Sequence, residues 1–167
     1  MINGEIYRGA QGYAGEVSIY NYKEQDQFNC EPGNPCFLKR WEVGLGIIED
    51  MKWMLAAEKE KALKFFKLTS SNIDNVDLKS VFIASRVKDD IAILALDKSA
   101  KRLGIKIAYL VNLFNPQAVI IGGGLEEAGE DFLNKVALKV REWALKEAAD
   151  DLKIAYSQLR ENAVALG

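Results

Sequence analysis

Three glycines followed by two glutamates form the stretch most able to do chemistry. Gly122 to Gly124 follow the apolar run Ala118 to Ile121 and precede Glu126 and Glu127. Glycines between a buried strand and a helix let backbone N–H groups approach a phosphate or an adenosine closely. Strand-to-helix turns also need glycine for steric reasons, and two glutamates in a first helical turn oppose a bound anion. The turn is therefore a candidate ligand site or a purely structural device, and it lacks the dinucleotide and Walker patterns.

A second stretch, "NCEPGNPC", places Cys30 and Cys36 on either side of a Pro-Gly turn. Soft thiolates favour zinc, but a structural zinc site normally takes four protein ligands, and the chain contains no histidine. The alternatives are a metal site, a disulfide or two reduced thiols. We expect reduced thiols, so Cys30 and Cys36 are only weak metal candidates.

A third stretch, "GYAGEVSIY", contains Glu16 beside small residues that permit tight backbone packing. Its carboxylate could accept hydrogen bonds from a polyol, or it could cap a neighbouring loop. The residues alone leave both readings open. Without histidine, the commonest general base is missing.

The elements that position these stretches change character along the chain. Residues up to about 40 are rich in turns and β-favouring segments, and Asn3-Gly4 predicts a tight β-hairpin turn. Because only two residues precede that turn, we expect the chain to begin in the middle of a sheet. From Trp41 to the turn-rich residues 69–77, helix formers predict one or two helices, interrupted by Gly44 and Gly46.

The remainder of the chain predicts alternating helices and strands. A short helix over 78–86 precedes a long, largely buried helix. Asp89 and Asp90 lie where its N-terminus favours negative charge, and it ends at Asn115-Pro116. A strand over 118–121, covered on both faces, leads through the glycines into another helix, and a final strand "LKIAYS" leads into a helix begun by "QLRENAVALG". The expected buried stripes are Ile91, Leu94, Leu103, Ile107, Leu110, Val111 and Phe114 in the long helix, and Ala128, Phe132, Val136, Val140 and Trp143 in the next.

Composition limits the classes of protein. The 167 residues fit a single domain with one core, and 22 basic against 24 acidic residues give no electrostatic footprint for nucleic acid. No apolar run approaches the length that spans a bilayer, and there is no secretory signal pattern. We expect a cytoplasmic protein that binds neither nucleic acid nor membrane.

The order of the motifs resembles the carboxy-terminal lobe of the ROK family of repressors, open reading frames and sugar kinases. The resemblance rests on "NGEIYRGAQGYAGEV", the cysteine and Pro-Gly loop, "LGIKIAYLVNLFNPQAVIIGGGLEEAG" and "YSQLRENAVALG", and it covers nearly the whole chain. It implies an α/β, actin-like ATPase (ribonuclease H-like) fold, of which residues 1–167 form one lobe, with a small mixed sheet packed with long helices. The amino-terminal lobe and any DNA-binding domain are expected to be absent.

The resemblance also assigns roles to particular residues. It implies that Glu16 contacts a sugar and that Gly122, Gly123 and Gly124 lie near a nucleotide. The chain departs from the family pattern where Ile19 replaces a sugar-facing, zinc-binding histidine. In the zinc loop, which is one residue short, Pro32 falls at a cysteine position and Leu38 at a sugar-binding glutamate. We therefore expect no zinc and no cofactor on this chain, with ATP and Mg²⁺ possible only in a kinase parent.

Three functional hypotheses follow. The first is a non-catalytic lobe of a sugar-responsive transcriptional regulator, whose complete form binds a sugar ligand. The second is a truncated lobe of an ATP-dependent sugar kinase, glucokinase-like or acting on N-acetylhexosamines. The third is a free-standing structural module, and under all three we expect a homo-oligomer, because apolar surface and a sheet edge normally covered by the other lobe tend to find partners.

Overall fold

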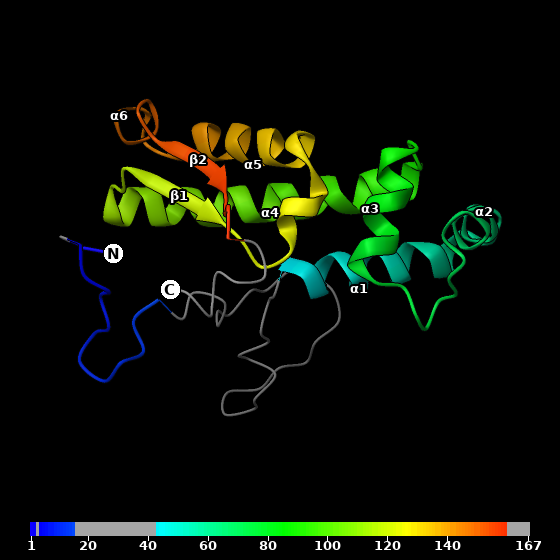
Figure 1. The fold of residues 1–167 in the computed structure, drawn as a ribbon. Coiled ribbons are helices and arrows are strands. Elements are labelled where there is room, and N and C mark those ends of the chain that lie inside the picture. Colours follow the sequence, from blue (N-terminus) through cyan, green and yellow to red (C-terminus); the bar gives the residue numbers. More distant parts are fainter. Residues whose placement is uncertain (3, 16–42, 160–167) are drawn as a thin grey trace, which may run out of the picture. The chain divides into compact units, whose positions relative to one another are not determined.

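The structure, a computed structural model, describes residues 1–2, 4–15 and 43–159 (Figure 1). The chain divides into two compact units, Met1–Glu42 and Val43–Gly167. The expectation that residues 1–167 form a single domain stays a prediction. Most of the predicted helix over 158–167 and most of the predicted amino-terminal strands lie outside the described residues.

The described part of the first unit contains the predicted hairpin turn. Ile2 and Glu5 form an antiparallel bridge, in which the Ile2 N–H donates to the Glu5 carbonyl at 2.9 Å and the Glu5 N–H donates to the Ile2 carbonyl at 3.0 Å. Gly4 has φ +83°, a conformation that a two-residue hairpin turn requires and that glycine adopts without strain. The predicted tight turn is confirmed at Ile2, Gly4 and Glu5, whereas Asn3 lies outside the described residues.

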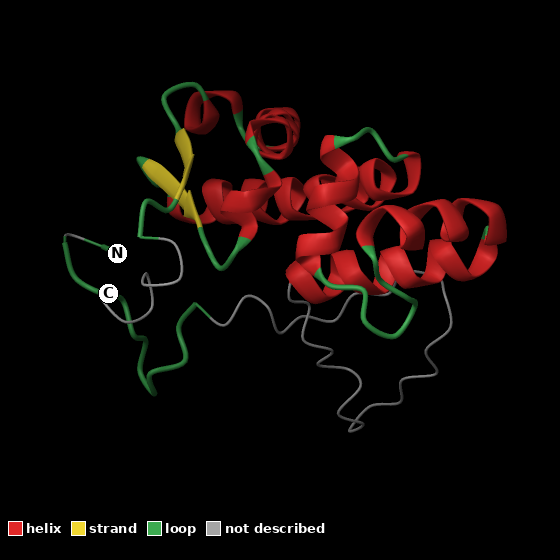
Figure 2. Ribbon diagram, turned by 45° about the vertical axis from the view of Figure 1, so that its right-hand side comes forward, coloured by secondary structure: helices red, strands yellow, loops and turns green. Residues whose placement is uncertain are grey.

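The described part of the second unit, residues 43–159, is mainly helical and contains two strands (Figure 2). Its elements in chain order are α1 (Val43–Ala57), α2 (Lys59–Thr69), α3 (Leu78–Arg86), α4 (Asp90–Phe114), β1 (Ala118–Ile121), the short 3₁₀ helix η2 (Leu125–Ala128), α5 (Glu130–Trp143), α6 (Lys146–Ala149) and β2 (Lys153–Tyr156).

Side-chain caps fix the ends of α3 and α4 where the sequence predicts them. The Asp77 carboxylate accepts from the Ser80 N–H at 2.8 Å, and the Ser80 hydroxyl oxygen accepts from the Asp77 N–H at 3.1 Å, which completes a capping box. The buried Asp89 carboxylate accepts from the Ala92 N–H at the start of α4. At the other end of α4, Asn115 is left-handed, with φ 43°, and the helix stops before the proline.

The predicted interruptions of α1 are wrong, because Gly44 and Gly46 both lie within the helix. Gly46 is buried. A Cβ on Gly44 would lie 3.0 Å from Leu78 Cδ1, so this glycine permits α1 to pack closely against α3. Tertiary packing here overrides the low helix propensity of glycine.

The predicted stripe of α4 is partly wrong. Leu94 is 49% exposed and Phe114 is 54% exposed. The buried side of the helix instead carries mainly small residues, which let α1, α3 and α5 approach closely: Ala92, Ala95, Ser99, Ala100, Gly104 and Ala108. In α5, Phe132, Val136 and Val140 are buried as predicted, whereas Trp143 at its end is exposed.

The two strands form a parallel pair connected through η2, α5 and α6. Ala118 pairs with Lys153 and Ile121 with Tyr156. The predicted burial of β1 on both faces is wrong, because Ile121 is buried but Ile120 is 63% exposed. Within residues 43–159 helices cover only one face of this pair, so alternate side chains remain open to solvent.

One core holds the second unit together. Its most deeply buried large side chains are Ile47, Met51, Leu55, Phe65, Val81, Val111, Val136 and Val140. They come from α1 through α5, so the helices share a single apolar interior. Among the described helices, none is long and apolar enough to cross a membrane.

Candidate functional site

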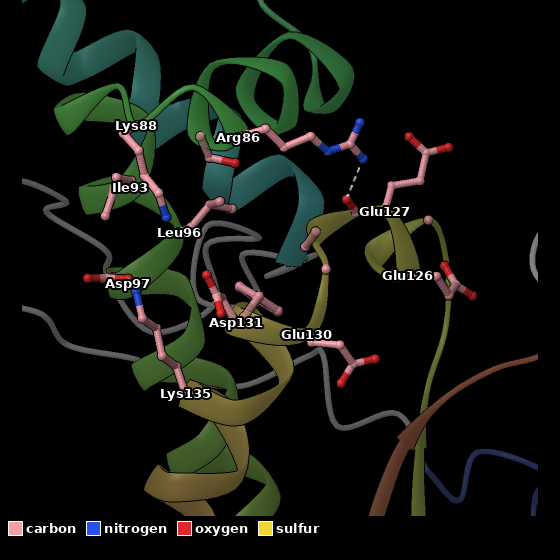
Figure 3. Close-up of a pocket in the computed structure, with 15 residues that line it drawn as sticks. Arg86, Lys88, Ile93, Leu96, Asp97, Glu126, Glu127, Glu130, Asp131 and Lys135 are labelled. Atoms are coloured by element: carbon pink, nitrogen blue, oxygen red, sulfur yellow. Dashed lines mark hydrogen bonds and ion pairs between the residues drawn. The ribbon is translucent and has the colours of Figure 1, made fainter.

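An open pocket lies where the corner between α3 and α4 faces the loop that joins β1 to α5 (Figure 3). Its volume is about 1170 Å³, and it opens widely to solvent. The corner contributes Ser85, Arg86 and Lys88; α4 contributes Ile93, Leu96 and Asp97; the loop and the start of α5 contribute Gly124, Glu126–Asp131, Phe132 and Lys135. Residues 126–132 and Lys135 therefore form one wall of this pocket, and the glycine turn contributes Gly124 to it.

Two of the three glycines are required by their backbone conformation. Gly123 has φ +76° and Gly124 has φ +86°, values that other residues rarely adopt. A Cβ on either residue would meet nothing within 4 Å, so open space lies beside them. A Cβ on Gly122 would make ordinary contacts, at 3.5 Å to Ser157 Cβ and 3.6 Å to Glu126 Oε1. The shape of the turn permits the close approach of a ligand to the backbone.

Carboxylates dominate the charge of this wall. Glu126 and Glu127 lie in η2, and Glu130 and Asp131 lie in the first turn of α5 (Figure 3). Glu126 Oε1 is buried and has no hydrogen-bond partner among the described residues. A buried acceptor without a donor is unfavourable, so this oxygen fits a ligand that donates a hydrogen bond better than a phosphate that accepts one.

Three cations also line the pocket, and two of them, Arg86 and Lys135, already form a hydrogen bond or an ion pair. Arg86 Nη2 donates to the Glu127 carbonyl oxygen at 3.0 Å. Lys135 forms an ion pair with Asp97 of α4. Lys88, which sits in the left-handed region with φ 63°, has no ion-pair partner among the described residues. Three cations thus stand against five carboxylates, and none of the described ion pairs neutralises Glu126 or Glu127.

Tyr156, the last residue of β2, forms a hydrogen bond to the end of the loop that joins β1 to α5. Its hydroxyl donates to the Gly129 carbonyl oxygen at 2.9 Å. Burial of the ring, with the nearby charges of Glu130 and Glu126, raises the pKa of Tyr156 to about 12. The hydroxyl therefore stays protonated and remains a donor at neutral pH.

The residues predicted as functional fall into two groups. Gly122 to Gly124 form the turn described above, but only Gly124 lines the pocket. Glu16, Cys30 and Cys36 lie outside the described residues, as do Ile19, Pro32 and Leu38. Within the described ranges, no group of three or more histidine, cysteine, aspartate or glutamate side chains could hold a metal ion.

Sequence reasoning missed Arg86 and Tyr156, both of which donate to backbone carbonyls of the loop. Arg86 is 41 residues from its acceptor and Tyr156 is 27 residues from its own. A backbone acceptor leaves no residue-type signature, so no sequence signal could have paired them. Asp97 and Lys135 were likewise unpaired in the sequence, because their helices meet only in the tertiary structure.

Comparisons with known proteins match the whole chain. A xylose repressor from Caldicellulosiruptor bescii is 29% identical over 167 residues, which is all of this chain and 41% of the repressor. A glucokinase from Halalkalibacterium halodurans is 28% identical over 167 residues, which is 50% of that enzyme. The chain thus spans half or less of the length of these two relatives.

Solved structures give the same result for the fold. The ROK family glucokinase from Streptomyces griseus, in complex with glucose and AMPPNP, superposes with a TM-score of 0.80 at 25% identity, over 98% of this chain and 52% of the glucokinase. This likeness confirms the predicted actin-like ATPase fold. The sequence model of the ROK family matches residues 1–167, and the chain belongs to the ROK family.

Proposed function

We propose that this chain is the carboxy-terminal, non-catalytic lobe of a sugar-responsive transcriptional regulator. The xylose repressor, which matches the chain over its full length, supports this proposal. The observation that carries it is the wall of carboxylates next to the glycine turn, in which Glu126 Oε1 is buried and lacks a hydrogen-bond donor among the described residues. A regulator needs the shape of this turn but not the ability to hold a triphosphate.

A nucleotide at this wall would meet negative charge. Glu126 and Glu127 follow the glycines after one intervening residue, Leu125, and their charges would repel the phosphates of ATP. The only described donor from the helices to the loop, Arg86, points to a backbone carbonyl. Kinases stabilise a transferring phosphoryl group with positioned cations and N–H groups, and a carboxylate wall works against that task.

The sequence of the amino-terminal part supports the same proposal. Ile19 and Leu38 stand where family kinases carry a histidine and a glutamate that face the sugar. Glu16 remains as the proposed sugar contact of the complete protein. The proposal includes no zinc at Cys30 and Cys36, because the loop keeps two of the usual ligands.

The second candidate is one lobe of an ATP-dependent sugar kinase. The TM-score of 0.80 with a glucokinase that holds glucose and AMPPNP favours it. In this case Gly122, Gly123 and Gly124 would pack against the nucleotide, and the carboxylates of η2 would have to face away from its phosphates. Phosphoryl transfer would also require groups from a second lobe.

Calorimetric titration tests the regulator proposal. We expect no heat when the chain is titrated to millimolar concentrations with Mg²⁺–ATP, glucose, xylose or N-acetylglucosamine. Submillimolar binding of ATP by the unaltered chain would overturn the regulator proposal. The double variant E126Q/E127Q should give more heat with Mg²⁺–ATP than the unaltered chain, whereas E142Q, a change at an exposed glutamate outside the pocket, should give as little as the unaltered chain.

Three further measurements test parts of the proposal. Metal analysis should find less than one zinc ion per chain, and a stoichiometric value would show that the cysteine loop does bind metal. Light scattering should detect self-association. The coding sequence upstream of Met1 should encode a winged helix if the protein is a regulator, and an aspartate-bearing phosphate loop if it is a kinase.

A further inference from the structure

The loop between β1 and α5 has few features of its own that hold its shape. Gly123, Gly124 and Gly129 all have positive φ, and a Cβ on any of them would meet nothing within 4 Å. Of the η2 residues only Leu125 is buried, with 5% of its surface exposed. Leu125 and Ala128 pack against the core, but the glycine-rich backbone on either side of them is conformationally free. The position of that backbone therefore depends on hydrogen bonds from other elements.

Two side chains from opposite sides supply those contacts. Tyr156 of β2 donates to the Gly129 carbonyl, and this bond stays within the strand–helix–strand segment that contains the loop. Arg86, the last residue of α3, donates to the Glu127 carbonyl. Among the described residues, this is the only hydrogen bond between the loop and helices α1 to α4. The two bonds thus have different structural consequences.

Hydrogen bonds fix the backbone of the α3–α4 corner that carries Arg86. The Val87 N–H donates to the Ala84 carbonyl at 3.2 Å, and the Lys88 N–H donates to the Ser85 carbonyl at 3.0 Å. Asp89, only 4% exposed, donates its own N–H to the Ala84 carbonyl at 3.0 Å and caps α4 through its carboxylate. The backbone that carries the Arg86 side chain therefore has a well-defined position, and the hydrogen bond to the Glu127 carbonyl connects the loop to it.

We propose that Arg86 is a positioning residue that couples the glycine loop to the α3–α4 corner. It holds the Glu127 carbonyl and thereby sets the distance between the two walls of the pocket. A change in the conformation of the loop is transmitted through this bond to residues 87–89 and to the helices that they connect. The coupling concerns the mechanics of the loop, so it applies to a regulator and to a kinase lobe alike.

The test uses the complete 167-residue chain and no ligand. Amide signals of residues 84–92 and 121–133 are followed by NMR in the unaltered chain, in R86M, and in K135M as a matched control. R86M keeps an apolar stem of similar length but removes the donor, whereas K135M removes the ion pair with Asp97 in the same pocket without touching the loop. A lost hydrogen bond of ordinary strength should raise amide exchange in the loop region by about twofold to tenfold. Leu133, whose N–H donates to the Gly129 carbonyl, is one reporter of that region.

The coupling itself is measured with a second change in the loop. Gly123→Ala strains the backbone at a positive φ and lies outside the lining of the pocket. It should shift the amide signals of Val87 to Asp89 in the unaltered background and in K135M, but not in R86M. Denaturant unfolding of each variant checks that R86M keeps the global stability of the unaltered chain.

Several outcomes would overturn the proposal. One is loop exchange in R86M equal to that of the unaltered chain. Another is an equal rise throughout α4, since this would indicate general destabilisation. A third is transmission from Gly123→Ala to the corner that persists in R86M, which would show that Arg86 is not the connection.

Discussion

The crossing of α4 and α5 at Gly104 makes a sharp prediction about stability. The α4–α5 interface is the most extensive between helices of the second unit. A Cβ placed on Gly104 would lie 2.5 Å from Lys139 Cβ and 2.8 Å from the Val136 carbonyl oxygen. Gly104→Ala therefore inserts one methyl group where two helical backbones are already in contact.

The magnitude follows from two opposing effects. The Cβ–Cβ distance falls roughly 1 Å short of ordinary contact, and part of the obstacle is backbone that cannot rotate away, so we expect the upper end of the roughly 1–3 kcal/mol that overpacking costs. Alanine in place of glycine within a helix returns about 1 kcal/mol. The free energy of unfolding should fall by about 2 kcal/mol, with a decrease in Tm of about 4–8 °C for a chain of this size.

Urea unfolding followed by far-UV circular dichroism measures the change. The matched control is Gly44→Ala, where the added Cβ would meet only the movable end of the Leu78 side chain. The control should stay within about 0.5 kcal/mol of the unaltered chain or be slightly more stable. If Gly104→Ala is as stable as the control, then α4 and α5 do not cross at this residue, and the reasoning about the helix interface is wrong.

Three other predictions follow from single residues. Asp77→Ala removes the cap of α3 and should lower the free energy of unfolding by about 0.5–2 kcal/mol in urea unfolding. Hydrogen bonds from Ser80 hold the pKa of Asp77 below its usual value, so the cap stabilises the fold fully above about pH 4 and is lost as pH falls through the lower folded-state pKa. The difference between variant and parent should therefore vanish in acid. Phe65→Ala empties the position that anchors α2 and should cost about 3–5 kcal/mol, whereas Leu63→Ala on the exposed side of the same helix should change stability by less than about 0.5 kcal/mol. Tyr156→Phe should remove a tyrosine that titrates near pH 12 in ultraviolet absorbance. Because the pKa of Tyr156 is raised from 10.0 in the folded chain, the stability that its neutral hydroxyl contributes is complete below pH 10 and is lost as pH rises towards 12. A normal titration of all tyrosines in the parent chain would contradict the burial of this ring.

The candidate site shows where sequence-based prediction ends. The glycine turn was recognisable because three consecutive glycines after an apolar strand are a local pattern, and two of them adopt positive φ. Arg86 and Tyr156 were not recognisable, because their acceptors are backbone carbonyls many residues away. The acidic character of the wall was readable from Glu126 and Glu127, but the burial of one carboxylate oxygen was not.

The sequence by itself determined the ends of α3, α4 and β1, but not the division between α1 and α2, nor the short elements η2 and α6. Asp77, Asp89 and Asn115 act on backbone groups within a few residues, so their effect is visible in the local order of residue types. Only the tertiary structure decided which side of α4 is buried and why Gly104 must be small. Those outcomes depend on how closely a second helix approaches, and that distance is set jointly by residues far apart in the chain.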